Sequence, residues 1–216
     1  MSQFSQQLIQ WQKLYGRHGL PWQVSEPYAR WISEVMLQQT QVVTVIDYYH
    51  RFMERFPTVT DLASANEDEV MRYWAGLGYY TRARNLHKAA KTIVETYGGV
   101  FPQKREEWEA LPGIGKSTAA AVTAFSFGAK EAILDGNVKR VLSRNFAITQ
   151  PMTAAVEKQL WALAQSLLPD NDIESYTQGL MDLGATVCTR TPKCEECPFQ
   201  ESCLSLLHIS EPTRQA

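Results

Sequence analysis

A proline-glycine turn between two predicted helices constrains the fold more than any other segment of the chain. In the run Leu-Pro-Gly-Ile-Gly at residues 111–115, the proline ring must end the preceding helix. Gly113 and Gly115 allow positive φ and the close approach of another backbone, and Ile114 is expected in the core. Residues 116–127 are mostly small and apolar, which predicts a buried helix that Gly128 ends. Such a turn can be purely structural, but the amides that begin the second helix also form an anion site.

Apolar residues recur at helical spacing wherever the chain shows a strong period. This pattern predicts helices over about residues 4–15, 28–35, 42–52, 82–97, 156–167 and 175–187. Asn66, with Glu69 three residues later, resembles a capping box that begins a further short helix. The sequence shows no alternating strand and no tandem repeat. We therefore predict an all-α fold of about ten helices, for which 216 residues with 44% apolar content provide the core of one large domain or two interleaved small ones.

The net charge of −2 gives no overall basic field, but the charges are unevenly distributed. Residues 70–94 contain five basic side chains and no acid, whereas acids cluster at residues 67–69 and 106–107. A neutral total with one basic face is consistent with DNA binding. The sequence has neither a signal peptide nor an apolar run of about 18 residues, so we expect a soluble, cytoplasmic protein with no membrane partner.

All four cysteines lie in one stretch, with the spacing Cys188-x5-Cys194-x2-Cys197-x5-Cys203. Disulfides are rare in a reducing compartment, so four thiolates this close indicate a metal centre, either zinc or a [4Fe-4S] cluster. Zinc ribbons usually use two CxxC pairs, and the single CxxC here favours the cluster. Its predicted role is structural, because it would hold a loop whose basic side chains reach a phosphate. The alternative is a folding staple with those charges merely solvated.

Two carboxylates stand in settings that suggest chemistry. Asp135 is a lone acid in an apolar-to-glycine turn just before a basic helix, although it could simply cap the helix of residues 137–147. Glu34 lies in the apolar run Trp-Ile-Ser-Glu-Val-Met-Leu, where desolvation is expected to favour its protonated form. The alternative for Glu34 is a salt-bridged helix acid. Two carboxylates with opposite protonation states are a recurrent catalytic arrangement.

Three motifs together resemble the helix-hairpin-helix DNA glycosylases that carry an iron–sulfur cluster. They are the turn at residues 111–115, the run Leu-Asp-Gly-Asn-Val-Lys-Arg at 134–140 and the four-cysteine loop. The runs Ser-Glu-Val-Met-Leu-Gln-Gln-Thr-Gln at 33–41 and Gly-Leu-Gly-Tyr-Tyr at 76–80 are similar to the bacterial branch that removes adenine mispaired with 8-oxoguanine. The resemblance covers about residues 4–203. The first cysteine loop differs, with five intervening residues where the family usually has six.

The resemblance implies two subdomains with the active site between them. Residues 28–135 would form a six-helix barrel, with the helix-hairpin-helix at about 104–127, and residues 1–27 and 136–203 would form the [4Fe-4S] cluster subdomain. The implied partner is double-stranded DNA with an A:8-oxoguanine or A:G mismatch, bound by a monomer that flips the adenine out of the duplex. An alkali cation at the helix-hairpin-helix is also implied.

The resemblance also assigns catalytic roles. Glu34 would protonate N7 of adenine, and Asp135 would stabilise the oxocarbenium ion or add to it, as in retaining glycosidases. Asn137 would orient the aspartate and the attacking water. Ser117 takes the position at which bifunctional relatives carry a nucleophilic lysine, because Lys116 comes one residue earlier on the helix. A monofunctional reaction that leaves the strand intact is therefore expected.

The remaining matched positions would bind the base or the duplex. Leu20, Trp22, Gln23, Leu37 and Gln178 are assigned to the adenine pocket. Gln178 is equally consistent with a capping box begun by Ser175. Gln38, Gln39 and Tyr79 would wedge into the duplex where the base leaves. The other DNA contacts are assigned to Gly113, Gly115, Lys116, Lys139, Arg140 and Arg190, and the cluster ligands to Cys188, Cys194, Cys197 and Cys203.

Residues 204–216 are expected to be a non-native tail, because they closely resemble a translated sequencing adapter. Family members usually continue here into a second domain that recognises 8-oxoguanine, so a truncated gene is expected; a natural short polar tail is the alternative. Two other functions remain open on the sequence alone. One is a bifunctional pyrimidine-damage glycosylase/lyase of the endonuclease III type, and the other is a non-catalytic DNA-binding module.

Overall fold

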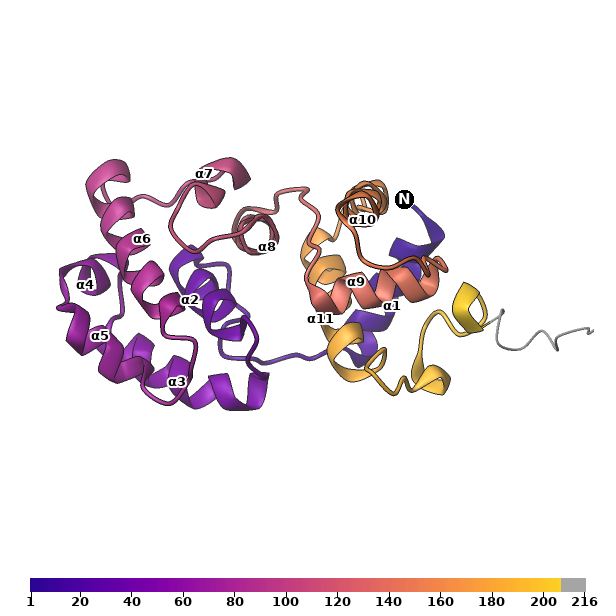
Figure 1. Ribbon diagram of the computed structural model, residues 1–216, viewed down its shortest axis with the longest axis horizontal. Coiled ribbons are helices and arrows are strands. Elements are labelled where there is room, and N and C mark those ends of the chain that lie inside the picture. Colours follow the sequence, from indigo (N-terminus) through magenta and orange to yellow (C-terminus); the bar gives the residue numbers. More distant parts are fainter. Residues whose placement is uncertain (207–216) are drawn as a thin grey trace, which may run out of the picture. The chain divides into compact units, whose positions relative to one another are not determined.

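The computed structural model describes residues 1–206, and every regular element in that range is a helix (Figure 1). The all-α prediction is therefore confirmed over the described residues. None of the helices in this range is long and apolar enough to span a membrane. The elements are α1 (Gln3–Tyr15), α2 (Pro27–Leu37), α3 (Val42–Arg55), α4 (Val59–Ser64), α5 (Glu67–Trp74), α6 (Thr81–Tyr97), α7 (Arg105–Glu109), α8 (Lys116–Phe127), α9 (Gly136–Asn145), α10 (Ala154–Ser166), α11 (Ile173–Thr186) and the short 3-10 helix η1 (Cys194–Glu196).

The chain folds as two compact units. The central unit is His18–Ala129 and contains α2 to α8, whereas the terminal unit combines Met1–Arg17 with the chain from Lys130 onward. In the structure the chain passes from one unit to the other after residues 17 and 129. The family resemblance placed these two boundaries after residues 27 and 135, which is later in the chain in both cases. The interpretation of the two units as a barrel and a cluster subdomain stays a prediction.

The core of the central unit is built around α2 and α8, which pack against each other. Trp31 of α2 is fully buried, and its ring lies edge-on to Trp108 with 5.7 Å between the ring centroids. The Trp108 indole N–H donates to the carbonyl of Pro102 at 2.6 Å, so this large side chain is buried without losing its hydrogen bond. Arg30 is also buried, with its guanidinium 4.0 Å from the centroid of the Phe125 ring in α8.

The core of the terminal unit joins the first helix to the last part of the described chain. Helix α1 packs on α11, and α11 packs on α9. Phe4 of α1 stacks on the buried ring of Phe199, which follows the cysteine CxxC pair, with 4.3 Å between centroids and an interplanar angle of 5°. Phe146, at the end of α9, lies 5.5 Å from Phe4. The aromatic cluster therefore fixes the cysteine-containing segment to α1.

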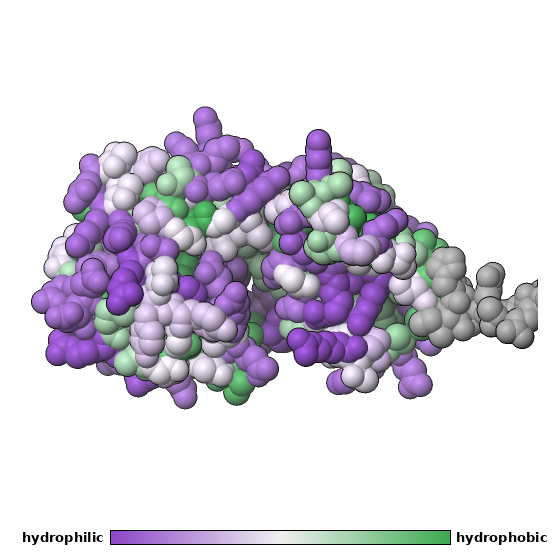
Figure 2. Space-filling model, viewed as in Figure 1, coloured by the Kyte–Doolittle hydropathy of each residue, from purple (hydrophilic) through white to green (hydrophobic). Residues whose placement is uncertain are grey.

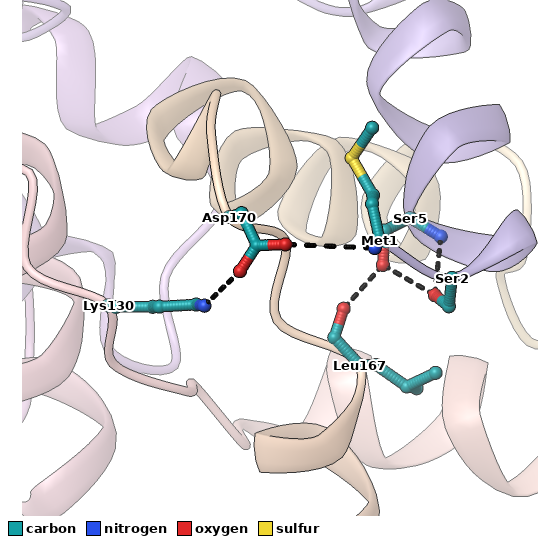
Figure 3. Close-up of polar contacts among 6 residues, drawn as sticks. All are labelled: Met1, Ser2, Ser5, Lys130, Leu167 and Asp170. Atoms are coloured by element: carbon teal, nitrogen blue, oxygen red, sulfur yellow. Dashed lines mark hydrogen bonds and ion pairs between the residues drawn. The ribbon is translucent and has the colours of Figure 1, made fainter.

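Polar contacts close the terminal unit at the start of α1. Figure 3 shows the Asp170 carboxylate between the Lys130 ammonium, at 2.6 Å, and the N-terminal amine, at 3.7 Å. The hydrogen bond from Lys130 lowers the pKa of Asp170. The pair is exposed and contributes little to stability. The buried hydroxyl of Ser5 donates to the carbonyl of Leu167, which joins α1 to the end of α10.

Two short helices differ from the predictions: one was missed, and one is present with only half of its predicted cap. Helix α4 was not predicted, although it begins with a complete capping box between Thr58 and Asp61. Asn66 does cap α5, by accepting from the Asp68 amide at 2.8 Å, but the expected return contact from Glu69 is not formed. The Glu69 carboxylate instead accepts from Arg55 at 2.7 Å. An ion pair across α3 and α5 therefore takes the place of the second half of the box.

The face drawn in Figure 2 is mainly hydrophilic. On this face, hydrophobic residues form only small separate patches on both units. Of the expected tail, residues 207–216 lie outside the described part of the chain. Ser205 is described, and its hydroxyl donates to the carbonyl of Arg144 at 2.6 Å.

Candidate functional site

The hairpin between α7 and α8 behaves differently at its two glycines. Gly113 has a φ of +75°, and a Cβ at this position would lie 2.6 Å from Cβ of Asn85 in α6. Glycine is therefore required there on both conformational and steric grounds. Gly115 has a φ of −85° with open space around it, so it does not use the positive φ that glycine allows. Gly115 is the exposed N-cap of α8, and as a glycine it has no side chain that could cap the helix.

The residues around the hairpin lie as their sequence suggests. Ile114 is buried in the central core, which confirms its predicted anchoring role. Helix α8 runs over the predicted residues and ends at Gly128, which has a φ of +64°. Lys116 is exposed and Ser117 is half-buried. The two side chains thus have different environments, as a rotation of about 100° per residue leads one to expect.

The candidate acid Glu34 lies near the end of α2. The helix begins at Glu26, whose carboxylate caps it by accepting from the amides of Tyr28 and Ala29 at 3.0 and 2.7 Å. Glu34 is half-buried, whereas its neighbours in the sequence on either side are buried. Directly after the helix, Gln38 donates from Nε2 to the Thr118 hydroxyl at 3.1 Å. This bond ties the end of α2 to the start of α8 within the central unit.

Four of the five residues assigned to the adenine pocket share the central unit with Glu34. Leu20 and Gln23 form a turn with two hydrogen bonds. The backbone N–H of Gln23 donates to the Leu20 carbonyl, and the backbone N–H of Leu20 donates to Oε1 of the Gln23 side chain, both at 2.9 Å. Trp22 between them is buried, edge-on to Tyr49 at 5.4 Å. Leu20 and Leu37 are half-buried against the same core. The fifth residue, Gln178, belongs to the terminal unit.

Asp135 is the N-cap of α9 in the terminal unit. Its Oδ1 accepts from the Val138 amide at 2.8 Å, so the capping role considered as a structural alternative is present. The residue is half-buried. Asn137 lies in the first turn of α9, and a Cβ on Gly184 of α11 would be only 2.7 Å from its Cβ. The close approach of α9 and α11 therefore depends on that glycine. The cap fixes the orientation of Asp135 and is compatible with a further role.

Arg140 ties α9 to the cysteine segment. Its guanidinium donates to Oδ1 of Asn137 at 2.8 Å and to the carbonyls of Gly184 and Cys188 at 2.6 and 2.7 Å. These contacts use the guanidinium inside the protein, and nothing in them supports the predicted DNA contact. Lys139 likewise pairs with Glu157 of α10 at 2.7 Å. DNA binding by either residue stays a prediction.

Gln178 is part of a buried polar cluster. Helix α11 begins at Ile173, before Ser175, so the capping-box alternative for Gln178 is wrong. Gln178 is buried, and its Nε2 donates to Oδ1 of Asp182 at 2.8 Å. Asp182 is fully buried and also accepts from the backbone N–H and Nε of Arg17 at 2.8 and 2.7 Å. A buried carboxylate needs this full set of donors.

The four cysteines are free thiols, and all are half-buried. Arg144 of α9 organises the first and last of them. It donates from Nη1 to the Thr189 carbonyl at 2.5 Å and to Sγ of Cys188 at 3.6 Å. Its own carbonyl accepts from the Cys203 thiol at 3.6 Å. Cys188 and Cys203, which are far apart in the sequence, are thus held at the same arginine.

The environment of Cys197 on its own favours the protonated thiol. Burial raises the pKa of this thiol to about 11, and the three other cysteines raise it further. A backbone amide, that of Phe199, points at its Sγ from 3.4 Å. Among the described residues, no three potential ligands are already arranged around one metal position. The donor set nevertheless fits an iron–sulfur cluster, which takes four cysteine sulfurs that accept backbone hydrogen bonds. Arg190, in the same segment, is exposed.

Three residues that organise these elements were missed in the sequence: Arg82, Arg144 and Asp182. Both arginines donate to backbone carbonyls more than 40 residues away in the sequence, so no local pattern marks them. Asp182 did have a signal, because it is an acid on the buried face of an apolar helix.

Comparison with known proteins places the chain among base excision DNA repair proteins. The profile of the HhH-GPD superfamily base excision DNA repair proteins matches residues 32–166. Adenine DNA glycosylase from Buchnera aphidicola subsp. Baizongia pistaciae is 45% identical over 207 residues, which are 95% of this chain and 59% of that protein. The human adenine DNA glycosylase is 46% identical over 187 residues, or 85% of this chain and 34% of that protein. The chain thus spans only part of these relatives.

Solved structures agree with this placement. A thermostable thymine-DNA glycosylase superposes with a TM-score of 0.86 at 31% identity, over 95% of both chains. An endonuclease III in a non-covalent complex with DNA superposes with a TM-score of 0.78 at 22% identity, over 96% of both chains, and shows the shared fold alone. The predicted helix-hairpin-helix glycosylase fold is confirmed. With its profile match and these similarities, the chain belongs to the HhH-GPD superfamily of base excision DNA repair proteins.

Proposed function

We propose that the protein hydrolyses the N-glycosidic bond of adenine mispaired with 8-oxoguanine or guanine in double-stranded DNA. One observation carries this proposal: the 45% identity to an adenine DNA glycosylase extends over 95% of the chain. The proposal also agrees with the runs at residues 33–41 and 76–80, which are similar to the branch of the family that removes adenine. Because the chain spans 59% of that relative, the proposal concerns the excision reaction and not the discrimination achieved by a longer protein.

Glu34 is proposed as the general acid. Adenine leaves poorly as an anion, and a proton delivered to N7 lets it leave as a neutral base. The side chain is half-buried on a helix whose neighbouring residues are buried, so it is partly shielded from bulk water. The bond between C1′ and N9 then breaks with both electrons going to the protonated base.

Asp135 is proposed to stabilise the positive charge that develops on the sugar. The capping bond from Val138 uses Oδ1 and fixes the carboxylate in one orientation. Asn137, held by Arg140, would orient the attacking water. The water oxygen bonds to C1′, and its proton passes to a carboxylate, which leaves an abasic site and free adenine. Asp135 as an N-cap and Asp135 as an electrostatic stabiliser are compatible, because the capping bond is made to Oδ1 and a carboxylate has a second oxygen.

Ser117 supports a monofunctional reaction. A lysine at this position could attack C1′ and form a Schiff base that leads to strand cleavage. A serine hydroxyl cannot form an imine, and the exposed Lys116 has a different environment. The strand is therefore proposed to stay intact until alkali is added.

DNA binding is proposed for the hairpin, the exposed loop residues and the cysteine segment. The amides at the N-terminus of α8, after the exposed Gly115, would hold one phosphate, with an alkali cation at the same hairpin. Gln38, Gln39 and Tyr79 would occupy the gap left by the flipped adenine. Cys188, Cys194, Cys197 and Cys203 would hold a [4Fe-4S] cluster, which supplies a rigid support for the exposed Arg190. We also propose that the protein acts as a monomer on DNA in the cytoplasm.

Single-turnover excision on a panel of duplexes tests the proposal. The panel carries A opposite 8-oxoguanine, A opposite G, T opposite G and an oxidised pyrimidine opposite G, with A opposite T as the control. Each reaction is divided and analysed with and without alkali. We expect strand breaks only after alkali, in the first two duplexes. Cleavage of the oxidised-pyrimidine duplex without alkali would favour the endonuclease III alternative, and binding without any product would favour a non-catalytic module.

A further inference from the structure

Two exposed loops of the central unit carry strained residues. The first, residues 38–41, follows α2, and the second, residues 75–80, joins α5 to α6. Gln39 has a φ of 58° and Tyr79 a φ of 49°, although neither is glycine. Gln39 is exposed, and Tyr79 is 61% exposed. Such backbone conformations are unfavourable for residues with a Cβ, so other contacts must hold them.

A single side chain, Arg82 of α6, contacts both loops. Its Nη1 donates to the carbonyls of Val35, Met36 and Gln38 at 3.0, 2.8 and 2.6 Å. These are two carbonyls from the last turn of α2 and one from the 38–41 loop. A positive charge at this end of a helix is also favoured by the helix dipole.

The other nitrogen of the guanidinium reaches across to the second loop. Nη2 donates to the carbonyl of Gly78 at 3.1 Å and to the Thr40 hydroxyl at 3.2 Å. The Cζ of Arg82 lies 5.3 Å from the ring centroids of both Trp74 and Tyr79. The indole of Trp74 donates to the same Gly78 carbonyl at 3.1 Å. One planar group therefore bridges the two loops and lies close to the ring of Tyr79.

The bridge depends on the shape of the guanidinium. Its two terminal nitrogens present donors in a fixed fork, so Nη1 reaches the end of α2 and the 38–41 loop while Nη2 reaches both loops. A lysine ammonium places its donors on one atom and could serve one loop well but not both.

We propose that Arg82 is a positioning residue that holds the 38–41 and 75–80 loops as one rigid element, so that Gln39 and Tyr79 enter the duplex together as the adenine leaves. This inference rests on the proposed function. It predicts that the rate of excision depends strongly on Arg82 when adenine must be extracted from a paired duplex, and only weakly when the adenine is already unstacked.

The experiment compares two substrates with the same sequence: a duplex with A opposite 8-oxoguanine, and the same strand in a bubble with the adenine and its neighbours unpaired. The variants are Arg82→Lys and Thr40→Val, which removes one acceptor and leaves Arg82 intact. The matched control is Arg55→Met, which loses an ion pair to Glu69 at 2.6 Å and a contact with the Phe56 ring but touches neither loop. Active-site titration gives the active fraction, and single-turnover assays at saturating enzyme give the rate constant.

For Arg82→Lys we expect a rate constant about 10- to 100-fold lower on the duplex, the range for a lost charge-assisted hydrogen bond, and within about threefold of wild type on the bubble. Thr40→Val should lose about three- to tenfold on the duplex only. Arg55→Met should match wild type on both substrates.

Three results would overturn the assignment. The first is a wild-type rate constant in both Arg82→Lys and Thr40→Val, and the second is an equal decrease in rate constant on the duplex and on the bubble. The third is a decrease in the active fraction alone, which a purely structural role would give. If Arg82→Lys does not fold, the Thr40→Val comparison decides. A wild-type protein that releases adenine from neither substrate would refute the proposed function itself, and the positioning role would fall with it.

Discussion

Replacing Gly113 with alanine tests whether this position of the hairpin requires glycine for stability, and the same substitution at Gly115 tests DNA binding. The residue has a φ of +75°, and the new Cβ would lie 2.6 Å from Cβ of Asn85. That neighbouring atom is attached directly to the backbone of α6, so it cannot rotate away. Either the hairpin or α6 must move to admit the methyl group.

The magnitude follows from three contributions. A left-handed backbone costs an L-residue about 1–2 kcal/mol, and overpacking of a close contact costs about 1–3 kcal/mol. The smaller conformational freedom of alanine in the unfolded chain offsets about 0.4–1 kcal/mol of this loss. Gly113→Ala should therefore lower the free energy of unfolding by about 2–4 kcal/mol, a large part of the stability of a typical domain.

Gly115→Ala is the matched control, because its φ of −85° is open to any residue and no atom lies within 4 Å of the position that the new methyl group would take. Its stability should change by less than about 1 kcal/mol, whereas its methyl group would lie where a phosphate is proposed to approach. Urea unfolding and fluorescence anisotropy with a mismatched duplex measure both quantities. A Gly113→Ala protein within about 0.5 kcal/mol of wild type would refute the steric argument. Unaltered DNA affinity in Gly115→Ala would refute the phosphate site.

Four further predictions concern the chemistry, the cluster and pH. Glu34→Gln should bind DNA but lose at least about 100-fold in single-turnover excision, and a loss of only about threefold would contradict its role as acid. Ser117→Lys should gain a borohydride-trappable, strand-nicking activity; nicking by wild type as fast as base release would exclude the monofunctional reaction. The purified protein should be yellow-brown with about four iron atoms per chain, whereas stoichiometric zinc without colour would rule out the cluster. Burial lowers the pKa of His87, so the unfolded chain binds a proton that the folded one does not, and stability should fall as pH drops below about 6.5. The urea midpoint should decline less in His87→Gln over this range, and equal declines would show that another group is responsible.

Local signals in the sequence were sufficient where a segment determines its own structure. Helix α8 begins and ends at the predicted residues, because the turn before it and Gly128 after it are both local stop signals. Helix α4 was missed because its six residues are too short to show a period, although its capping pair was present in the sequence. The two glycines of the turn look alike in the sequence, yet only Gly113 has a positive φ, and Gly115 is an N-cap in extended geometry.

Contacts between distant segments could not be predicted in the same way. For the arginines at 82, 140 and 144, nothing local in the sequence distinguishes a phosphate ligand from a side chain that binds carbonyl groups of its own protein. In the structure, Arg140 reaches the carbonyl of Cys188 and Arg144 that of Thr189. Such partners become visible only when the helices have packed, because backbone carbonyls carry no sequence identity.

The intact mass of the adenine-containing strand, taken before any alkali treatment, tests the central claim most directly. The strand is annealed opposite 8-oxoguanine, incubated with excess protein and measured by mass spectrometry. The account predicts a full-length strand that has lost adenine and gained one water, with Glu34→Gln leaving the mass unchanged. A strand of unchanged mass with wild type, or a shortened strand ending at the lesion, would contradict it.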